Sequence, residues 1–367
     1  MGETTGDLRT LPLEDLHRAA GAKFGGFAGW SMPLTYPAGV MAEHLHTRDA
    51  AGLFDISHMK LVEIAGREAD ALLARACPVA PGDIAAGQSK YTFLLAEDAG
   101  ILDDLIVTRL GATRWMIVAN AGNADADIAH LQALAAGFDV AVTPLDRVFL
   151  ALQGPAAEQV LSAAGLDLST LTFMQGTEPK PGWFASRSGY TGEDGFEVAI
   201  PVEEARAFAE RLTSDERVQW IGLAARDSLR LEAGLCLHGQ DITPATNPAD
   251  AGLVWAIPKP LRAGGPFVGA DALGRAIAAG PSRRRVGLKP EGRQPVRAGT
   301  KLFSGEDEIG EVTSGGFGPS AGHPVAMGYV AAALAGPGTH VEADVRGRRI
   351  PVEIHPLPFT PHRYRKG

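Results

Sequence analysis

The chain has 367 residues, of which 45% are hydrophobic and 21% charged, so it is too long for one small module and has enough apolar material for several buried cores. Its 34 Lys and Arg stand against 43 Asp and Glu, a formal net charge of -9, which argues against nucleic acid or an anionic membrane as the main partner. Cys77 and Cys236 lie far apart and form no paired motif. We therefore expect a reduced, cytoplasmic compartment and no cysteine-built metal site.

The start of the chain carries no recognisable targeting pattern. Glu3, Asp7 and Arg9 lie within the first ten residues, and no apolar stretch follows them, so we expect neither a signal peptide nor a transit peptide. The longest stretch without Asp, Glu, Lys or Arg, residues 312–341, is interrupted by Gly, Pro, Ser and His. A membrane span needs roughly 20 apolar residues in a row, and we expect none here.

The first sixty residues are predicted to form a helix, a glycine-rich turn, a second helix and a strand. Pro12 opens the first helix, residues 40–51 form the second, which Gly52 ends, and residues 53–56 begin the strand.

Residues 60 to about 146 are expected to form an α+β unit. Helices predicted at 68–76 and 124–136 alternate with short strands, which are predicted at 61–64, 91–95, 102–109 and 115–119.

The segment after residue 147 returns to strands and helices. Its helices are predicted at 156–164, 201–212 and 224–233, and we expect it to complete the core that the N-terminal segment begins. A composition break at 243–247 and a helix at 270–279 mark a last boundary. Beyond it, short strands separated by Gly and Pro predict a small β-barrel or sandwich.

Several attractive motifs fail on geometry. Asp55, Ser57 and His58 are the residue types of a hydrolase triad, but neighbours on an extended strand point to opposite faces, so we reject a triad. His44 and His46 are two apart in a predicted helix and cannot share a face as metal ligands. We expect them to be surface or packing residues. No GxGxxG follows a strand, and there is no Walker sequence.

Two carboxylates, Asp103 and Asp104, stand at the start of an otherwise apolar strand. Period two sends them to opposite faces, so they cannot form a dyad that shares a proton. We expect one to cap the turn at Ala99 and Gly100 and the other to enter a pocket. The residues alone leave open whether either carboxylate is functional.

Glu197 interrupts an apolar strand just after the glycine-rich turn 189–195. It is either a charge on an edge strand or an acceptor for two adjacent N–H donors on a flat ligand. On the helix that follows, a purely structural role for Arg226 would be pairing with Asp227 and Glu232.

Together these segments resemble the T protein of the glycine cleavage system, a family of tetrahydrofolate-dependent aminomethyltransferases. No single motif is decisive, but their order and spacing are specific. The matching segments span the chain: residues 27–30, 32–33, 43–44, 52–59, 101–107, 189–197, 222–237, 312–315 and 358–359. The resemblance implies an α+β fold with three domains in a cloverleaf around a central folate channel: residues 1–59 with 148–245, an inserted domain at 60–147, and 246–367 with a C-terminal β-barrel.

The resemblance also implies roles for particular residues. Asp104 is similar to the catalytic carboxylate near N5 and N10 of the folate, Glu197 to the residue that grips the pterin, and Arg226 to its basic partner. A pterin presents an amino group and a ring N–H side by side, which a carboxylate can accept, while an arginine can donate to a carbonyl or carboxylate. Three positions resemble those that pack the folate and a fourth a substrate-contacting tyrosine: Tyr91, Tyr190, Met59 and Tyr364.

The implied reaction takes an aminomethyl group from the lipoyl arm of the H protein, releases ammonia and leaves 5,10-methylenetetrahydrofolate. It requires no metal or redox cofactor. A fixed carboxylate near the transferred carbon can stabilise cationic character or manage a proton, and the sequence leaves both roles open.

Two other functions fit the same fold. A folate-binding relative that assists iron–sulfur assembly shares the Cys, Gly and Gln of residues 234–241, but its leading Lys-Gly pair, Tyr and Glu are missing here. Asp104 and the complete turn at 189–195 favour the transferase. A folate-dependent demethylase that acts on a small methylated substrate is the second alternative, and it would need no H protein.

Two positive runs stand out in this acidic chain. They are either ordinary solvated charge or a surface that steers the carrier protein: Arg283, Arg284 and Arg285, and Arg363, Arg365 and Lys366.

Overall fold

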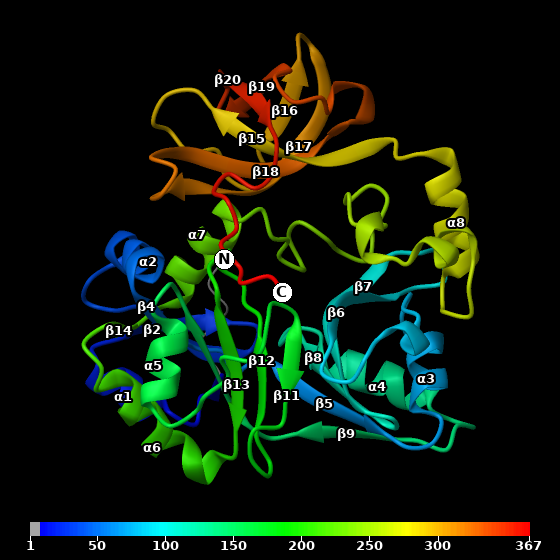
Figure 1. Ribbon diagram of the computed structural model, residues 1–367. Helices are drawn as coiled ribbons and strands as arrows, with labels where there is room; N and C mark the ends of the chain where they lie inside the picture. Colours follow the sequence, from blue (N-terminus) through cyan, green and yellow to red (C-terminus); the bar gives the residue numbers. More distant parts are fainter. Residues whose placement is uncertain (1–7) are drawn as a thin grey trace.

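Short apolar runs separated by turns build four sheets in the structure, a computed structural model that describes residues 8–367. The predicted α+β fold with a C-terminal β-barrel is confirmed. Figure 1 shows a six-stranded sheet at lower left, a five-stranded sheet at lower right and the barrel at the top. The expectation that the chain starts without a targeting segment concerns mainly residues 1–7, which lie outside the described residues.

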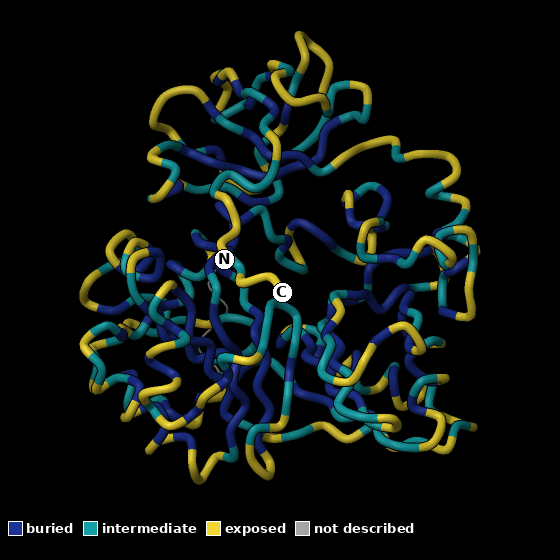
Figure 2. The backbone as a smooth tube through the Cα atoms, in the orientation of Figure 1, coloured by how far each residue is buried: buried dark blue, intermediate teal, exposed yellow. Residues whose placement is uncertain are grey.

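The six-stranded sheet joins two distant parts of the chain. Its central strands β4, β10 and β13 are buried along their whole length, as Figure 2 shows by their dark colour, and such near-continuous apolar runs are typical of strands covered on both faces. The order is β11 (Gln175–Thr177), β12 (Phe184–Arg187), β13 (Gly195–Ile200), β10 (Val148–Gln153), β4 (Ala51–Asp55) and β14 (Val218–Trp220).

Helices and a second sheet cover the two faces of this sheet. One face packs on α1, α5 and α6 through a large apolar cluster. The other face packs on α7 and on strands of the five-stranded sheet, through a cluster that includes Phe54, Phe149, Met116 and Leu229. The helices are α1 (Glu14–Ala19), α2 (Val40–Asp49), α5 (Ala157–Ala163), α6 (Val202–Thr213) and α7 (Leu223–Glu232).

The five-stranded sheet is antiparallel and comes from one continuous part of the chain, with α3 (Ala69–Ala76), η1 (Pro81–Asp83) and α4 (Ala124–Leu134) beside it. Along its second strand, buried and half-buried residues alternate from Ile101 to Val107, as period two predicts. The strand order is β6 (Ser89–Leu95), β7 (Ile101–Gly111), β8 (Arg114–Ala119), β5 (Lys60–Ala65) and β9 (Ala141–Leu145).

The C-terminal barrel is closed, so its strands leave no exposed edge. Its interior holds an apolar cluster with Leu288, Leu302 and Val312, and a smaller cluster joins strand β18 to Leu231 of α7. The order is β15 (Arg283–Pro290), β18 (His323–Ala331), β17 (Asp307–Gly318), β16 (Lys301–Ser304), β19 (His340–Val345) and β20 (Arg348–His355), with η4 (Ala332–Leu334) after β18.

The predicted elements are close to those observed, with three differences. The second predicted helix ends at Asp49 rather than residue 51, because Ala51 already starts the buried strand β4. The glycine-rich turn is a hairpin of β2 (Lys23–Phe27) and β3 (Trp30–Thr35), with β1 (Arg9–Thr10) beside it. The strands β9, β11, β12 and β14 were not predicted.

Two connecting segments lie where the sheets and the barrel approach one another (Figure 1). The stretch after α7 carries η2 (Val254–Ala256) and η3 (Lys259–Ala263), and then α8 (Ala270–Ala279) packs on β6 and β7. The C-terminal tail returns to the six-stranded sheet, where the Phe173 N–H donates to the carbonyl of Arg365. Among residues 8–367, no helix combines the length and the apolar character that crossing a bilayer demands.

Candidate functional site

Asp104 lies on strand β7 and is held by groups from both neighbouring strands. The Tyr91 hydroxyl, from β6, donates to Asp104 Oδ2 over 2.9 Å. Asn120, which follows directly after β8, donates from Nδ2 to Asp104 Oδ1, also over 2.9 Å. Two fixed donors from a paired sheet leave the carboxylate little freedom to rotate.

The surroundings of Asp104 raise its pKa to about 6. Burial is the largest cause, and the nearby charge of Asp103 adds to it, while Tyr91, His238 and Asn120 act in the opposite direction. A carboxyl with such a pKa can take up or release a proton near neutral pH, which is the property expected of an acid/base group.

Asp103 points to the other face of β7, and the predicted separation of the two carboxylates is confirmed. It is fully buried and accepts hydrogen bonds from Asn120 and Asn123. The prediction that one of the pair caps the preceding turn is wrong. Asp98 does so, because its Oδ1 accepts the Gly100 N–H over 3.0 Å.

Glu197 lies on β13, which is paired on both sides with β12 and β10. The edge-strand interpretation of this residue is therefore wrong. Glu197 is 7% exposed, and Ser188 Oγ donates to its Oε2 over 2.8 Å. Burial raises the pKa of Glu197, and Arg226 and Ser188 oppose that rise. Glu197 lies on the same sheet face as Ala199, which belongs to the cluster beneath α7.

Arg226 comes from α7 and places its guanidinium over the ring of Tyr190, 4.9 Å from the ring centre. The interpretation that pairs it with acidic helix neighbours is wrong: Asp227 pairs with Arg230, and Glu232 pairs with Arg48. Arg226 Nη1 is buried and has no hydrogen-bond partner among the described residues. Burial lowers the pKa of Arg226, and the nearby Glu197 and Tyr190 oppose that change.

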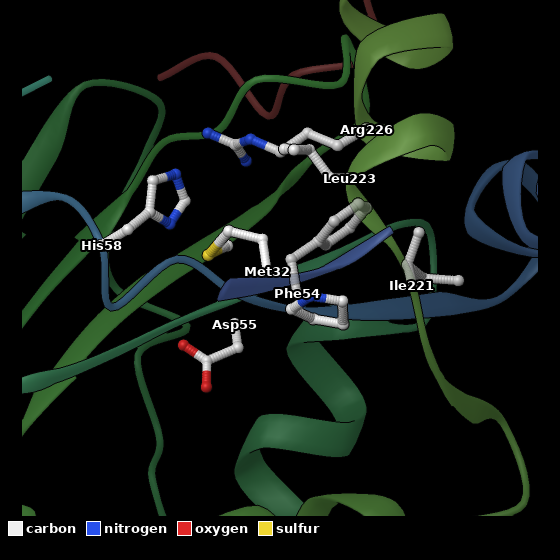
Figure 3. A pocket seen from close by; sticks show the side chains of 8 residues that line it. Met32, Phe54, Asp55, His58, Ile221, Leu223 and Arg226 are labelled. Carbon is white, nitrogen blue, oxygen red and sulfur yellow. The ribbon is translucent and has the colours of Figure 1, made fainter. Parts of the chain in front are cut away.

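Arg226 also lines a small pocket with His58 (Figure 3). The guanidinium extends toward the imidazole ring, and the Met32 side chain lies below both. The cavity has a volume of about 10 Å³, enough for one water molecule. Burial, with the charge of Arg226, lowers the pKa of His58 to about 3, so the ring is neutral at physiological pH.

The rejection of a triad at residues 55–58 is confirmed. Ser57 Oγ donates to Asp55, and His17 Nε2 lies 2.8 Å from the other oxygen of the same carboxylate. His58 Nδ1 has no partner in the part of the chain that the structure describes. His44 is a packing residue rather than a surface residue: it is fully buried and contacts Ser228, Glu232 and Ser320.

Three further predicted residues lie in different surroundings. Tyr190 donates its hydroxyl to the carbonyl of Cys236 and lies beneath the guanidinium of Arg226. Burial raises the pKa of Tyr190, and the charge of Asp104 adds to the rise. Met59 packs against the cluster beneath α7. Tyr364 stacks on Phe173 with ring centres 3.9 Å apart, and within residues 8–367 no hydrogen bond or ring contact links it to the other predicted residues.

Trp255 is a neighbour of the site that sequence reasoning missed. Its ring is nearly parallel to that of Tyr91, with an interplanar angle of 15° and centres 5.8 Å apart, and it is 67% exposed. Such a large exposed aromatic next to a half-buried tyrosine–carboxylate pair is typical of a ligand-binding surface. It lies in a connecting segment without a motif, so only the folded chain shows it.

Comparison with known proteins assigns the chain to a class and then to a family. The curated relatives are named aminomethyltransferases, so the class is a transferase enzyme. Residues 13–260 match the GCVT N-terminal domain, and residues 283–360 match the glycine cleavage T-protein C-terminal barrel domain. The chain belongs to the glycine cleavage T-protein family, as its sequence motifs predicted.

The relatives match over nearly their full length. A mitochondrial aminomethyltransferase from Gallus gallus is 42% identical over 372 residues, which cover 97% of this chain and 94% of that protein. An aminomethyltransferase from Streptomyces coelicolor is 42% identical over 370 residues, 96% of this chain and 98% of that protein. The glycine cleavage system aminomethyltransferase T from Bartonella henselae has a TM-score of 0.96 and 60% identity, and the match covers 98% of this chain and 100% of that structure.

Proposed function

We propose that the protein transfers the methylene of an aminomethyl group, carried on the lipoyl arm of an H protein, to tetrahydrofolate and releases ammonia. Membership of the family supports this reaction class. The observation that carries the proposal is that the buried Glu197 and the half-buried Arg226 have no ion pair among residues 8–367 and that Arg226 lies over the ring of Tyr190.

The proposed folate site fits the polar groups of a pterin. Glu197 accepts from Ser188 through Oε2, so lone pairs remain for the two adjacent N–H donors of the ring. Arg226 Nη1, which lacks a partner among residues 8–367, can donate to the ring carbonyl. We propose that Tyr91, Tyr190 and Met59 form apolar walls around the bound ring. We propose that Tyr364, near the C-terminus of the chain, contacts the substrate.

Asp104 is the proposed catalytic carboxylate. When bound, tetrahydrofolate supplies the amine nitrogen that accepts the one-carbon unit. Tyr91 and Asn120 fix both Asp104 oxygens, so the carboxylate can oppose positive charge on the transferred carbon without first reorganising. Its raised pKa also lets it take a proton that leaves during the transfer.

We propose that this site lies in a central folate channel and that three domains surround the channel as a cloverleaf. Sheet membership supports the division: the six-stranded sheet uses residues from 1–59 and 148–245, the five-stranded sheet lies within 60–147, and the barrel lies within 246–367. We also propose a cytoplasmic location. The name of the Streptomyces coelicolor relative is compatible with it because it carries no mitochondrial label, whereas the Gallus gallus relative is named mitochondrial.

The alternative functions have less support. An iron–sulfur assembly role would use Cys236, but this thiol is 8% exposed and its pKa is raised to about 12, mainly by burial, so little reactive thiolate forms at neutral pH. A demethylase would share the folate site, but the curated relatives are named aminomethyltransferases.

The test is ammonia release from aminomethyl-lipoyl H protein in the presence of tetrahydrofolate, with unloaded H protein as the control. We expect ammonia and methylenetetrahydrofolate in equal amounts. Methylated small amines, ethers and thioethers are assayed in parallel. Turnover of one of these without H protein would replace the transferase proposal with the demethylase.

A further inference from the structure

His238 joins two parts of the chain through its imidazole ring. It lies in the segment that follows α7, and its side chain is 8% exposed. Its Nε2 lies 3.0 Å from the carbonyl oxygen of Ile101, at the start of β7. Its Nδ1 lies 2.8 Å from Nδ2 of Asn123, directly before α4. The ring therefore connects the segment after α7 with the five-stranded sheet and with α4.

The two partners determine which ring nitrogen carries the proton. A carbonyl oxygen only accepts hydrogen bonds, so Nε2 of His238 must donate to Ile101. The amide nitrogen of Asn123 only donates, so Nδ1 must accept from it. The ring in this arrangement is neutral, with its proton on Nε2.

Asn123 connects His238 to the two carboxylates of β7. Its Nδ2 also donates to Asp103 Oδ1 over 2.7 Å. Asn120 Nδ2 donates to the same Asp103 oxygen over 3.0 Å and to Asp104 Oδ1 over 2.9 Å. His238 Nδ1 lies 3.9 Å from Asp103 Oδ1, which is too far for a hydrogen bond, so the connection runs through Asn123.

The side chain of Asn123 does not stabilise the helix that it precedes. Asn123 occupies the N-cap position of α4, where an Asn side chain commonly accepts a backbone N–H. Here it makes no capping hydrogen bond, and its amide nitrogen donates to Asp103 and His238 instead. These two acceptors determine the orientation of the amide, and His238 supplies one of them.

We propose that His238 is a positioning residue for Asp104. Its Nε2–H fixes the ring on β7, and its Nδ1 holds the Asn123 amide where that amide supports the hydrogen bonds of Asp103 and Asn120. The consequence for turnover rests on the proposed role of Asp104. The hydrogen-bond arrangement requires no substrate, so it can be tested even if the proposed reaction is wrong.

The first experiment measures the tautomer of His238 in the substrate-free protein. The ¹⁵N signals of this ring are assigned by their loss in His238→Gln or His238→Asn. At pH 7 we expect a proton on Nε2 and an unprotonated Nδ1. The signals are those of the wild-type ring, so reduced stability of a variant does not decide the outcome. A proton on Nδ1, with or without one on Nε2, overturns the proposal, because Asn123 could then not donate to this atom.

Two substitutions separate the two contacts of the ring. An Asn side chain places its amide oxygen near the position of Nδ1, so His238→Asn keeps an acceptor for Asn123 and loses the bond to Ile101. A Gln side chain places its amide nitrogen near the position of Nε2, so His238→Gln keeps the bond to Ile101 and loses the acceptor.

The ¹³C carboxyl resonance of Asp104 shows the effect of these variants without substrate. The resonance is assigned by its loss in Asp104→Asn. We expect it to move in His238→Gln and to keep its wild-type position in His238→Asn. A wild-type position in His238→Gln contradicts the proposal, and so does an equal movement in the two variants.

Turnover of aminomethylated H protein tests the consequence for the reaction. In His238→Gln, kcat is expected to fall by roughly 10-fold or more, the scale of a displaced catalytic group, while the KM for tetrahydrofolate stays at its wild-type value. We expect His238→Asn to keep wild-type kcat. The control is His340→Gln, which changes an exposed histidine at the start of β19. If the Asp104 resonance moves in His238→Gln and kcat does not, His238 positions Asp104 but the catalytic role proposed for Asp104 is wrong.

A double substitution distinguishes positioning from mere support of the fold. Asn123→Ala removes the group through which His238 acts, so adding His238→Gln to it is expected to cause no further loss of kcat. Losses that multiply in the double variant contradict the proposal. A structural role alone would lower the thermal stability of His238→Gln and leave its kcat per folded site at the wild-type value.

Discussion

At the scale of single residues, Asp104→Asn separates catalysis from folding. The amide oxygen can still accept from Asn120, and the amide nitrogen can donate to the Tyr91 oxygen, so the local hydrogen bonds are kept. The charge and the proton-binding site are lost, and turnover is expected to fall by roughly 10²-fold or more. Single-turnover kinetics measures the loss of turnover, and calorimetry with tetrahydrofolate measures whether the folded site still binds its substrate.

The control for this variant is Asp125→Asn, since Asp125 is exposed on α4. We also expect Asp103→Asn to lose much less turnover at the pH optimum than Asp104→Asn. Equal losses at the two positions would show that the catalytic carboxylate has been assigned wrongly.

Glu197→Gln tests the proposed pterin contact. The substitution turns one acceptor oxygen into a donor that faces the ring's own N–H groups, so tetrahydrofolate binding is expected to weaken by about 1.5 to 3 kcal/mol, the scale of a hydrogen bond to a charged group. Isothermal titration calorimetry measures the change. Glu203→Gln on the exposed start of α6 is the matched control, and an unchanged affinity in Glu197→Gln would remove this residue from the folate site.

At the scale of secondary-structure elements, Glu232 at the end of α7 joins three parts of the chain. Its carboxylate contacts His44 and Arg48 of α2, and it accepts the backbone N–H groups of Ser320 and Ala321 from the barrel. Thr360 of the C-terminal tail also donates to it. One buried carboxylate thus holds a helix, the barrel and the tail together.

This arrangement predicts how stability depends on pH. Burial alone would raise the pKa of Glu232, but the hydrogen bond and charge of His44, the Ala321 N–H and the charge of Arg48 outweigh it and lower the pKa to about 2. A depressed pKa stabilises the folded state above the unfolded-state value of about 4.5, and this stabilisation is lost as the pH falls toward 2. It amounts to roughly 3 kcal/mol.

Glu232→Gln is therefore expected to lower the free energy of unfolding at pH 7 by roughly 3 kcal/mol or more. The gap between variant and wild type should narrow below pH 4.5. Urea unfolding between pH 7 and pH 3 measures both. Glu210→Gln, which breaks only an exposed pair with Arg206, should change the free energy of unfolding by less than about 1 kcal/mol at any pH. A gap for Glu232→Gln that stays constant with pH would contradict the assigned pKa.

Sequence patterns predicted those features of the fold and of the site that neighbouring residues determine on their own. Period two along β7 predicted the opposite directions of Asp103 and Asp104, because side chains alternate on any strand. The same reasoning could not show that β13 lies inside the sheet, since its neighbours β12 and β10 are set by chain topology. The interpretation that pairs Arg226 with its helix neighbours was wrong for the same reason. Glu232 pairs instead with Arg48, which is far away in sequence.

At the scale of the whole molecule, the structure reduces the number of positively charged residues that are free to steer the carrier protein. Arg283 pairs with Asp250, and Arg285 donates to the carbonyls of Gly234 and Ala251. In the terminal run, Arg363 and Arg365 are paired with Glu193 and Glu158. Within residues 8–367, the exposed members of the two runs that have no ion pair are Arg284 and Lys366.

We expect the double substitution Arg284→Gln with Lys366→Gln to raise the KM for aminomethylated H protein, most clearly at low salt, and to leave tetrahydrofolate affinity unchanged. Charge steering acts mainly on the association rate, and salt screens it. Arg348→Gln on the barrel strand β20 is the control. A KM with wild-type value and wild-type salt dependence would mean that these charges are ordinary solvated groups.

The discontinuous six-stranded sheet also constrains the order of events on the ribosome. Strand β4 is complete before residue 60 is translated, yet its partners β10 and β14 emerge only after the whole five-stranded sheet has been synthesised. The nascent chain must therefore keep the apolar residues of β4 from aggregating during that interval. The inserted sheet, whose strands are contiguous in sequence, can pair first and offer the apolar side chains of β5 and β8 as a surface for β4.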